Sequence, residues 1–302
     1  MAVRKWHLNK PAQCILIVLF LSGVVLVARK ILWPDELVYK GKPITEWMEI
    51  TFRGDLPGTS MSTAEWMEVA DAVDKAGTNI IPYALKLAWT QDSALKRTIL
   101  KSPWPRKVFN FLGSSKRFDR WAQASSVNPQ IATDALKFLG PRGKPAVPEL
   151  LRLLRTSNNP NGRVAAVRML SRIGREAQPA LPELLQGFKD QNVDVREAVS
   201  EAVTRISSIE APSVVGDDSA TAQYRRYQEH SVALMLPVVL KLLTDPSADA
   251  DRLIGTLQYF SFEEGWAATP GLLELMNHPD IAVRARATNA LERIHPSALK
   301  QR

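Results

Sequence analysis

The chain has 302 residues, of which 45% are apolar, and carries a formal net charge of +8. This apolar content is enough for a continuous core, and the basic excess suggests an anionic partner until the excess is located. The only cysteine, Cys14, lies in an uncharged N-terminal run. The rest of the chain therefore excludes disulfides and cysteine-ligated zinc sites.

A hydrophobic segment follows a short basic tail at the N-terminus. No charged residue occurs between Ala12 and Ala28. Roughly seventeen to twenty helical residues, at about 1.5 Å each, span a hydrocarbon core of about 30 Å. Trp6 and Trp33 flank the segment in the manner of interfacial anchors. We therefore predict an uncleaved transmembrane signal anchor over residues 12–31.

A cleaved signal peptide and a buried soluble helix are the alternatives to an anchor. Cleavage after Ala28 needs a small residue three positions before the cut, where the chain has Leu26. The flanking tryptophans argue against a buried helix. Basic residues lie on both sides of the segment, so its early position favours a cytoplasmic N-terminus and an exported body, with sidedness left open.

From residue 62 onward, the chain repeats a helical hairpin. Ser62 and Glu65 fit a capping box for a helix whose buried stripe includes Trp66. Pro148 and Pro182 are 34 residues apart and stand where a first helix begins, a position at which proline loses no intrahelical hydrogen bond. The prolines that open the successive first helices are Pro82, Pro148, Pro182, Pro237 and Pro270.

The second regular hairpin shows the pattern most clearly. Its first helix places apolar residues at i, i+3, i+4 and i+7, and after a polar loop over 189–194 its second helix is amphipathic too. Each hairpin alone leaves an apolar face in water, so neighbours must stack. The residues predicted to be buried are Leu181, Leu184, Leu185, Phe188, Val195, Ala198, Val199, Ala202, Val203 and Ile206.

This combination resembles HEAT repeats of the PBS-lyase-like type. The resemblance rests on the Pro-x-Leu-Leu start, the short Asp/Asn loop and the Val-Arg-x-Ala-like start of each second helix, and it covers about residues 62–299. Ankyrin and tetratricopeptide repeats have similar periods, but their signatures are absent. The resemblance implies an all-α fold, a HEAT-like α-solenoid in which five or six hairpins form a right-handed superhelix, here with one N-terminal transmembrane helix.

The leader Tyr39-Lys-Gly-Lys-Pro-Ile-Thr-Glu-Trp47 carries a second resemblance. It is similar to an element that precedes the hairpins in membrane-tethered bacterial HEAT-repeat proteins of unassigned function. This likeness implies a single-pass protein of the bacterial inner membrane with an exported repeat body.

Two interruptions divide the predicted array. One is an irregular basic segment, and the other is an insert whose Pro, Gly and Asp residues predict some loop. The expected organisation is a basic tail, the anchor, a linker with a leader helix, and the array. The boundaries are 1–11, 12–31, 32–61 and 62–302, with the interruptions at 97–134 and 207–230.

The stretch from Lys96 to Trp121 combines eight basic residues with one acid, Asp119, and several aromatic residues. Such a mixture suits anionic lipid headgroups or an envelope polymer, and also nucleic acid, from which export would separate it. Alternatively, the aromatic residues fill the gap of an irregular repeat beneath a solvated basic surface. The candidate anion-binding residues are Lys96, Arg97, Lys101, Trp104, Arg106, Lys107, Lys116, Arg117, Arg120 and Trp121.

Two arginine columns recur with the repeats. The resemblance assigns Arg163, Arg196 and Arg284 to the structural Asp/Arg ladder of HEAT-like arrays. The second column directly precedes a buried isoleucine near the end of each second helix, where positive charge is favourable. With the residues one turn earlier, it either lines a concave binding face or forms solvated helix surface. The candidate partner-binding residues are Arg168, Arg172, Glu201, Arg205, Asn289 and Arg293.

Catalytic patterns are scarce in this sequence. It has four histidines, no His-Glu dipeptide of the kind that binds iron in HEAT hydroxylases, no Gly-rich phosphate loop and no Gly-x-Ser-x-Gly elbow. We therefore predict no enzymatic activity, no cofactor and no metal site. The predicted function is a membrane-anchored scaffold that presents a curved surface to another protein, whose identity stays open together with the oligomeric state. Anionic lipid or envelope-polymer binding through residues 96–121 is the alternative, and a bilin-lyase-like subunit is the least favoured.

Overall fold

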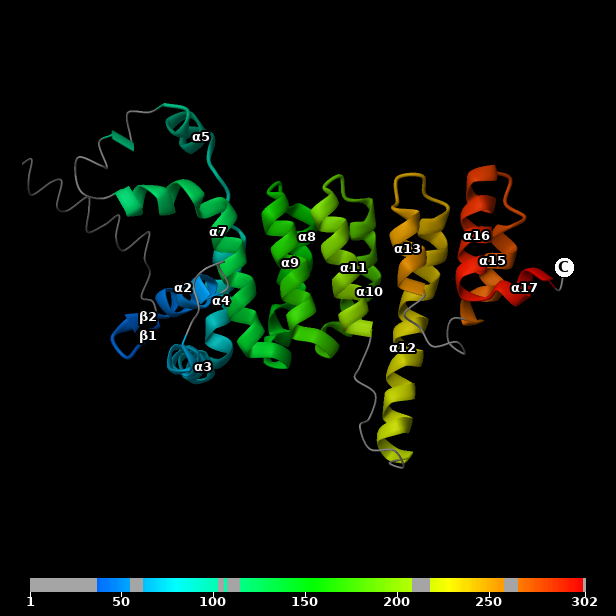
Figure 1. The fold of residues 1–302 in the computed structure, drawn as a ribbon, viewed down its shortest axis with the longest axis horizontal. Coiled ribbons are helices and arrows are strands. Elements are labelled where there is room, and N and C mark those ends of the chain that lie inside the picture. Colours follow the sequence, from blue (N-terminus) through cyan, green and yellow to red (C-terminus); the bar gives the residue numbers. More distant parts are fainter. Residues whose placement is uncertain are drawn as a thin grey trace, which may run out of the picture.

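A computed structural model shows an α-solenoid in which helical pairs follow one another in a row (Figure 1). Among the helices of the described residues, none is both long and apolar enough to cross a membrane. The predicted tail and anchor, residues 1–31, lie outside these residues. The structure describes residues 37–54, 62–102, 106–107, 115–207, 218–257 and 266–300.

Five helical pairs form the described array, and their members fall into two rows. Within each pair the two helices contact each other, and each second-row helix also contacts the next one along the row. The first-row helices are α4 (Ile81–Ala88), α8 (Val147–Thr156), α10 (Leu181–Leu184) with its 3-10 continuation η4 (Leu185–Lys189), α12 (Asp218–Leu243) and α15 (Thr269–Leu275). The second-row helices are α7 (Ser115–Leu139), α9 (Pro160–Ile173), α11 (Val193–Ser207), α13 (Ala250–Leu257) and α16 (Ile281–Ile294).

One continuous apolar core runs between the two rows. All ten residues predicted to be buried in the second regular hairpin are buried, which confirms the period assigned to both of its helices. Phe188 is the largest of them and is completely enclosed. Because neighbouring pairs share this core, no pair closes its apolar surface alone.

Glycines with positive φ follow α7, α9 and the earlier helix α3 (Thr63–Ala76), and each connects its helix to the next first-row helix. Gly174 has φ 69° and ψ −134°, and its amide donates to the Leu170 carbonyl at the end of α9. Gly140 and Gly77 end α7 and α3 with φ of 50° and 54°. A 3-10 segment then leads to the proline-containing first turn, over η1 (Gly77–Ile80), η2 (Gly140–Ala146) and η3 (Gly174–Ala180). A residue with a side chain rarely adopts this backbone conformation, so glycine sets the angle between successive pairs.

Helix α7 differs from the predicted irregular segment. Its second half is a regular second-row helix, in which Ile131 and Leu136 are buried and which packs on α4 and α9. Its first half points in a different direction (Figure 1). Pro129 lies within the helix at 115–139 and cannot donate an intrahelical hydrogen bond, which accounts for the bend. Helix α5 (Ala94–Leu100) precedes it.

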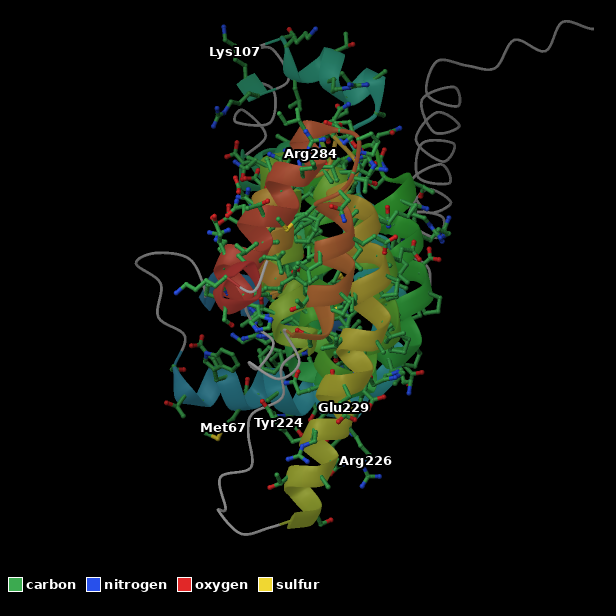
Figure 2. The ribbon with its side chains drawn as sticks, turned by 90° about the vertical axis from the view of Figure 1, so that its right-hand side faces the viewer. Met67, Lys107, Tyr224, Arg226, Glu229 and Arg284 are labelled. Atoms are coloured by element: carbon green, nitrogen blue, oxygen red, sulfur yellow. The ribbon has the colours of Figure 1, made fainter. Side chains whose placement is uncertain are left out.

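Helix α12 differs from the predicted insert. The prediction placed the first-row helix at Pro237, whereas the helix begins at Asp218, and residues 208–217 lie outside the described residues. Its N-terminal half projects past the neighbouring helices and carries the residues labelled Tyr224, Arg226 and Glu229 (Figures 1 and 2). Tyr227 secures this extension, because its hydroxyl donates to the Ile206 carbonyl, and its burial raises its pKa to about 12.

The leader closes the N-terminal end of the array. Strands β1 (Val38–Tyr39) and β2 (Lys42–Pro43) form a short antiparallel hairpin, a local departure from the all-α prediction, and α2 (Ile44–Gly54) and α3 (Thr63–Ala76) follow. The Tyr39 hydroxyl donates to the Asp71 carboxylate on α3, and the indole of Trp47, 2% exposed, donates to the Tyr39 carbonyl at 3.0 Å. The leader motif therefore covers apolar surface that a preceding repeat would otherwise cover.

The predicted capping box at the start of α3 is confirmed. The Ser62 hydroxyl accepts from the Glu65 amide at 3.2 Å, and the Glu65 carboxylate accepts from the Ser62 amide at 2.8 Å. The stripe assigned to this helix is wrong at Trp66, which is 36% exposed and packs on Phe138 with its ring centroid 4.9 Å away.

Replacement of Gly174 by alanine should lower the free energy of unfolding by about 1 to 3 kcal/mol, because the backbone there is strained for any side chain. Gly255 is the matched control. It lies inside α13 with open space around its Cα, so Gly255→Ala should stabilise by about 0.5 to 1 kcal/mol. Urea unfolding followed by circular dichroism measures both. Equal effects of the two substitutions would contradict the assigned role of Gly174.

Candidate functional site

An arginine–aspartate ladder joins successive second helices near their N-termini. The Arg163 guanidinium on α9 holds the Asp190 carboxylate at 2.7 Å through Nε and at 2.9 Å through Nη2. Its third nitrogen, Nη1, donates to the Ser157 carbonyl at 2.8 Å. Both side chains of the pair are largely buried, so the geometry is fixed by packing as well as by charge.

The next step of the ladder repeats this arrangement. Arg196 on α11 donates through Nε to Asp249 at 3.0 Å and through Nη1 to the Asp190 carbonyl at 2.8 Å. Burial raises the pKa of Asp249, but hydrogen bonds from the Arg252 amide and guanidinium and from Arg196 outweigh burial and hold the pKa below its ordinary value. The structural role predicted for Arg163 and Arg196 is confirmed.

Arg284 occupies the ladder position of the last pair. Its Nη1 donates to the carbonyls of His278 and Pro279, each at 2.8 Å. No carboxylate among the described residues bonds to it. Between the fourth and the last pair the connection is made instead by Arg286, whose Nη1 donates to the carbonyl of Leu243 at the end of α12 at 3.0 Å and to that of Asp245 in the following loop at 3.1 Å.

Charged side chains along the first row and its flanking 3-10 segments are paired between neighbours. Arg155 on α8 contacts Glu183 on α10 at 3.0 Å. The remaining pairs between successive repeats on this side are Lys144–Glu176 at 2.8 Å, Lys189–Asp245 at 3.0 Å and Arg142–Asp74 at 2.9 Å. These ion pairs are partly exposed and contribute little to stability individually. Other first-row charges, among them the exposed Lys86 and Lys241, form no ion pair within the described residues.

The second row carries charges that no ion pair uses. We call the six predicted partner-binding residues the second-row strip. They are exposed or half-buried, and within the described residues none of them forms an ion pair. The corresponding positions of the fourth pair, 258 and 262, lie outside the described residues. The strip consists of Arg168 and Arg172 on α9, Glu201 and Arg205 on α11, and Asn289 and Arg293 on α16.

The strip is ordered by the repeat itself. Arg168 and Glu201 are 33 residues apart, as are Arg163 and Arg196, so they occupy equivalent positions on helices that contact each other. Two exposed acids, Glu197 and Glu292, flank the strip and were missed by the sequence analysis. Neither acid belongs to an arginine column, so the recurrence of arginine in the sequence does not point to them. The result is an unpaired surface of mixed sign with four arginines.

The described residues of the basic segment differ in exposure and pairing. The prediction is wrong for Lys96, which is 8% exposed and whose ammonium contacts the Asp92 carboxylate at 2.5 Å. Asp92 also accepts from the Ser125 hydroxyl at 2.9 Å, so this pair fastens α5 to α7. Arg106 is exposed but pairs with Asp119 at 3.2 Å.

Three basic residues of the segment present free charges. Arg97, Lys101 and Lys107 are exposed and form no ion pair within the described part of the chain. Lys107 lies at one extremity of the molecule, beyond the ends of the stacked helices (Figure 2). Trp104 lies outside the described residues, as do the side chains of Lys116, Arg117, Arg120 and Trp121.

Two histidines and several carboxylates of the described residues have structural partners. The Asp280 amide donates to His278 Nδ1 at 3.1 Å, and Thr269 lies 2.9 Å from His295 Nδ1. Hydrogen bonds from the Ser247 hydroxyl and amide hold the pKa of Asp245 well below its usual range. The described residues contain no cluster of three or more His, Cys, Asp or Glu side chains suited to a metal ion. The shifted carboxyl groups are thus stabilised as anions and are unsuited to general acid catalysis.

A family model described as HEAT repeats matches residues 121–204 and 147–233. This stretch of the chain consists of HEAT repeats. The match covers α7 to the first half of α12, including both ladder steps and the strip residues of α9 and α11. No curated protein matches the chain. HEAT repeats are generally non-catalytic scaffolds that mediate protein–protein interaction.

Replacement of Arg163 by glutamine should lower the free energy of unfolding by about 2 kcal/mol, because it leaves a largely buried Asp190 without its charged donor. Arg168→Gln on the same helix is the control and should change the stability by less than about 0.5 kcal/mol, since that side chain is exposed. Urea denaturation gives both values. A ladder role for Arg163 would be disproved by two indistinguishable curves.

Proposed function

We propose that this protein is a membrane-anchored HEAT-repeat scaffold that binds another protein through its second-row strip. The observation that carries the proposal is the second-row strip itself. Its side chains recur at equivalent positions of successive repeats, and its charges have no ion-pair partner among the described residues. A rigid surface whose charges are unpaired is suited to a partner of complementary charge.

The strip combines a constant and a variable column. Arg172, Arg205 and Arg293 repeat a positive charge, which would attract an acidic surface and speed encounter. The neighbouring column changes from arginine to glutamate to asparagine along the array. That change of sign would select one partner and one register among acidic surfaces.

The membrane anchor at 12–31 is part of the proposal. The described residues begin at Leu37, just before the leader hairpin. About five residues, 32–36, would therefore join the proposed anchor to them. Such a short connection would hold the N-terminal end of the array near the bilayer and raise the effective concentration of the strip for a membrane partner. We place the protein in a bacterial inner membrane with its repeat body exported, in line with the resemblance of its leader. No chemical step is assigned to it.

Charge reversal on the strip tests the scaffold. The full chain should stay in the membrane pellet after carbonate extraction, and crosslinking before solubilisation should recover a specific protein. The double variant Arg168→Glu/Arg205→Glu should recover that protein at least roughly tenfold less efficiently. The control is Lys86→Glu/Lys241→Glu, which reverses two exposed first-row lysines that have no ion-pair partner in the described structure. Equal recovery by both variants would refute binding through the strip.

Anionic surface binding through the basic segment is a second candidate function. It is supported by the exposed and unpaired charges of Arg97, Lys101 and Lys107, and by their place beyond the ends of the stacked helices (Figure 2). A surface of this kind could rest on anionic lipid while the strip faces a partner, so the two functions are compatible.

Vesicle flotation tests the second candidate on residues 34–302, which lack the anchor. Vesicles with anionic lipid should carry this fragment, and Lys101→Glu/Lys107→Glu should weaken binding by about 2 kcal/mol or more, since each basic residue near the surface contributes about 1 kcal/mol. The Lys86→Glu/Lys241→Glu variant is matched in residue type and charge. Flotation that both variants reduce equally would show non-specific attraction, and failure of the unmodified fragment to float would rule the function out.

A further inference from the structure

Helix α16, the last second-row helix of the described residues, presents a partly exposed face that no described element covers, at the place where an internal helix such as α9 meets its neighbour. On α9 the positions that face α11 include Val167, which is completely buried. The equivalent residue of α16 is Thr288, which is half-exposed, and Ile281 on the same face is 73% exposed. We call this surface the terminal face. It consists of Ile281, Arg284, Ala285, Thr288 and Glu292.

The terminal face contains an unfinished step of the ladder. Arg163 and Arg284 donate through Nη1 in the same way, to a carbonyl six residues earlier at 2.8 Å. Arg163 then uses Nε and Nη2 to hold Asp190 of the following repeat. In Arg284 these two nitrogens have no partner among the described residues, and the residue belongs to the end of the array that faces the viewer in Figure 2. The ladder therefore specifies what is missing here, namely a carboxylate.

A carboxylate of suitable position exists on the same face. Glu292 is exposed, forms no ion pair within the described part of the chain, and lies eight residues after Arg284, about two helical turns away. Arg284 stands near the positive N-terminal end of α16, and Glu292 stands in its last turn, near the negative end. Each charge is thus opposed to the dipole of its own helix. In an antiparallel pair of such helices, each charge would lie beside the favourable end of the other.

Small side chains occupy the middle of the terminal face. Ala285 is exposed, and the Thr288 hydroxyl donates to the Arg284 carbonyl of its own helix at 2.9 Å. The threonine hydroxyl is therefore hydrogen-bonded within its own helix, and the side chain can present its methyl group to a partner. Small residues between two charged ends let two helices approach closely without a steric conflict.

We propose that two copies of this chain associate end to end through their terminal faces, with the two α16 helices antiparallel around a twofold axis near Thr288. In this arrangement Arg284 of each copy holds the partner's Glu292, so both ladders end on a carboxylate. The same surface patch serves on both sides, as twofold symmetry requires. The second rows of the two copies then run on through the interface as one longer array.

The size of the terminal face sets the strength of this association. A stable protein–protein interface typically buries about 1,200 to 2,000 Å² of total accessible surface. One helix from each copy should bury less surface than this, so the dimer should be reversible. The two ion pairs define the register and the antiparallel direction, while Ile281 and the small residues supply the apolar contact. The proposal depends neither on the strip nor on the anchor.

A charge-swap cycle in the purified full chain tests the proposal. Sedimentation velocity in detergent should show a monomer–dimer equilibrium. Glu292→Arg should weaken dimerisation at least roughly tenfold, because it places two arginines opposite each other at both ends of the interface. Arg284→Glu should do the same, and the double variant Arg284→Glu/Glu292→Arg should restore the dimer. Thermal unfolding checks that Glu292→Arg, which alters an exposed residue, leaves the fold intact, so that the cycle can be read even if Arg284→Glu is destabilised.

Disulfide trapping locates the twofold axis. In a Cys14→Ser background, Thr288→Cys should form an interchain disulfide under mild oxidation, since the two side chains meet at the axis. Arg293→Cys, on the same helix but off the terminal face, should not. A full chain that stays monomeric at the highest concentration, a dimer that survives Glu292→Arg, or equal trapping at both cysteines would each overturn the proposal.

Discussion

The arginine–aspartate ladder is the constraint on which the arrangement of the repeats depends. Apolar stacking brings successive pairs together, but it is non-directional and permits neighbouring helices to slide. Arg163 removes that freedom, because its planar guanidinium bonds Asp190 of the next repeat and the Ser157 carbonyl of its own at the same time. Arg196 makes the same kind of connection, to Asp249 of the next repeat and to the Asp190 carbonyl of its own. The polar loop of each of these repeats is therefore positioned by the ladder arginine of the repeat before it.

The two ends and the two sides of an open array expose apolar surface and polar groups, and this structure satisfies them in different ways. The N-terminal end is closed by the leader, whose Tyr39 and Trp47 bond across β1, α2 and α3. The C-terminal end leaves a ladder arginine, Arg284, without a carboxylate among the described residues. Along the sides, four ion pairs join successive repeats next to the first row, and the second-row strip forms no ion pair among the described residues. The strip and Arg284 thus leave polar groups unused at positions that the repeat itself defines.

The repeat period could be read from the sequence because apolar spacing is a local property, and the burial of Leu181 and Val195 follows from it directly. The glycine junctions could not be predicted from the apolar period, although Gly140 and Gly174 share the repeat spacing, because a positive φ is a backbone property that apolar spacing does not encode. The bend at Pro129 and the early start of α12 arise where tertiary packing overrides a weak apolar pattern. Lys96 was misassigned because a count of charges ignores a carboxylate four residues earlier on the chain.

The same comparison of repeats separates structure from specificity. The two complete ladder steps keep one residue type, at Arg163 and Arg196, because both meet the same geometry, whereas the fourth pair has Leu253 at the equivalent position. The second-row strip contains a column of this constant kind and a column that changes sign from Arg168 to Glu201. Stacking places no demand on that second column, whose side chains are exposed and form no ion pair in the described structure. Since the scaffold leaves these positions free to vary, they are the positions at which a HEAT array can encode the identity of its partner.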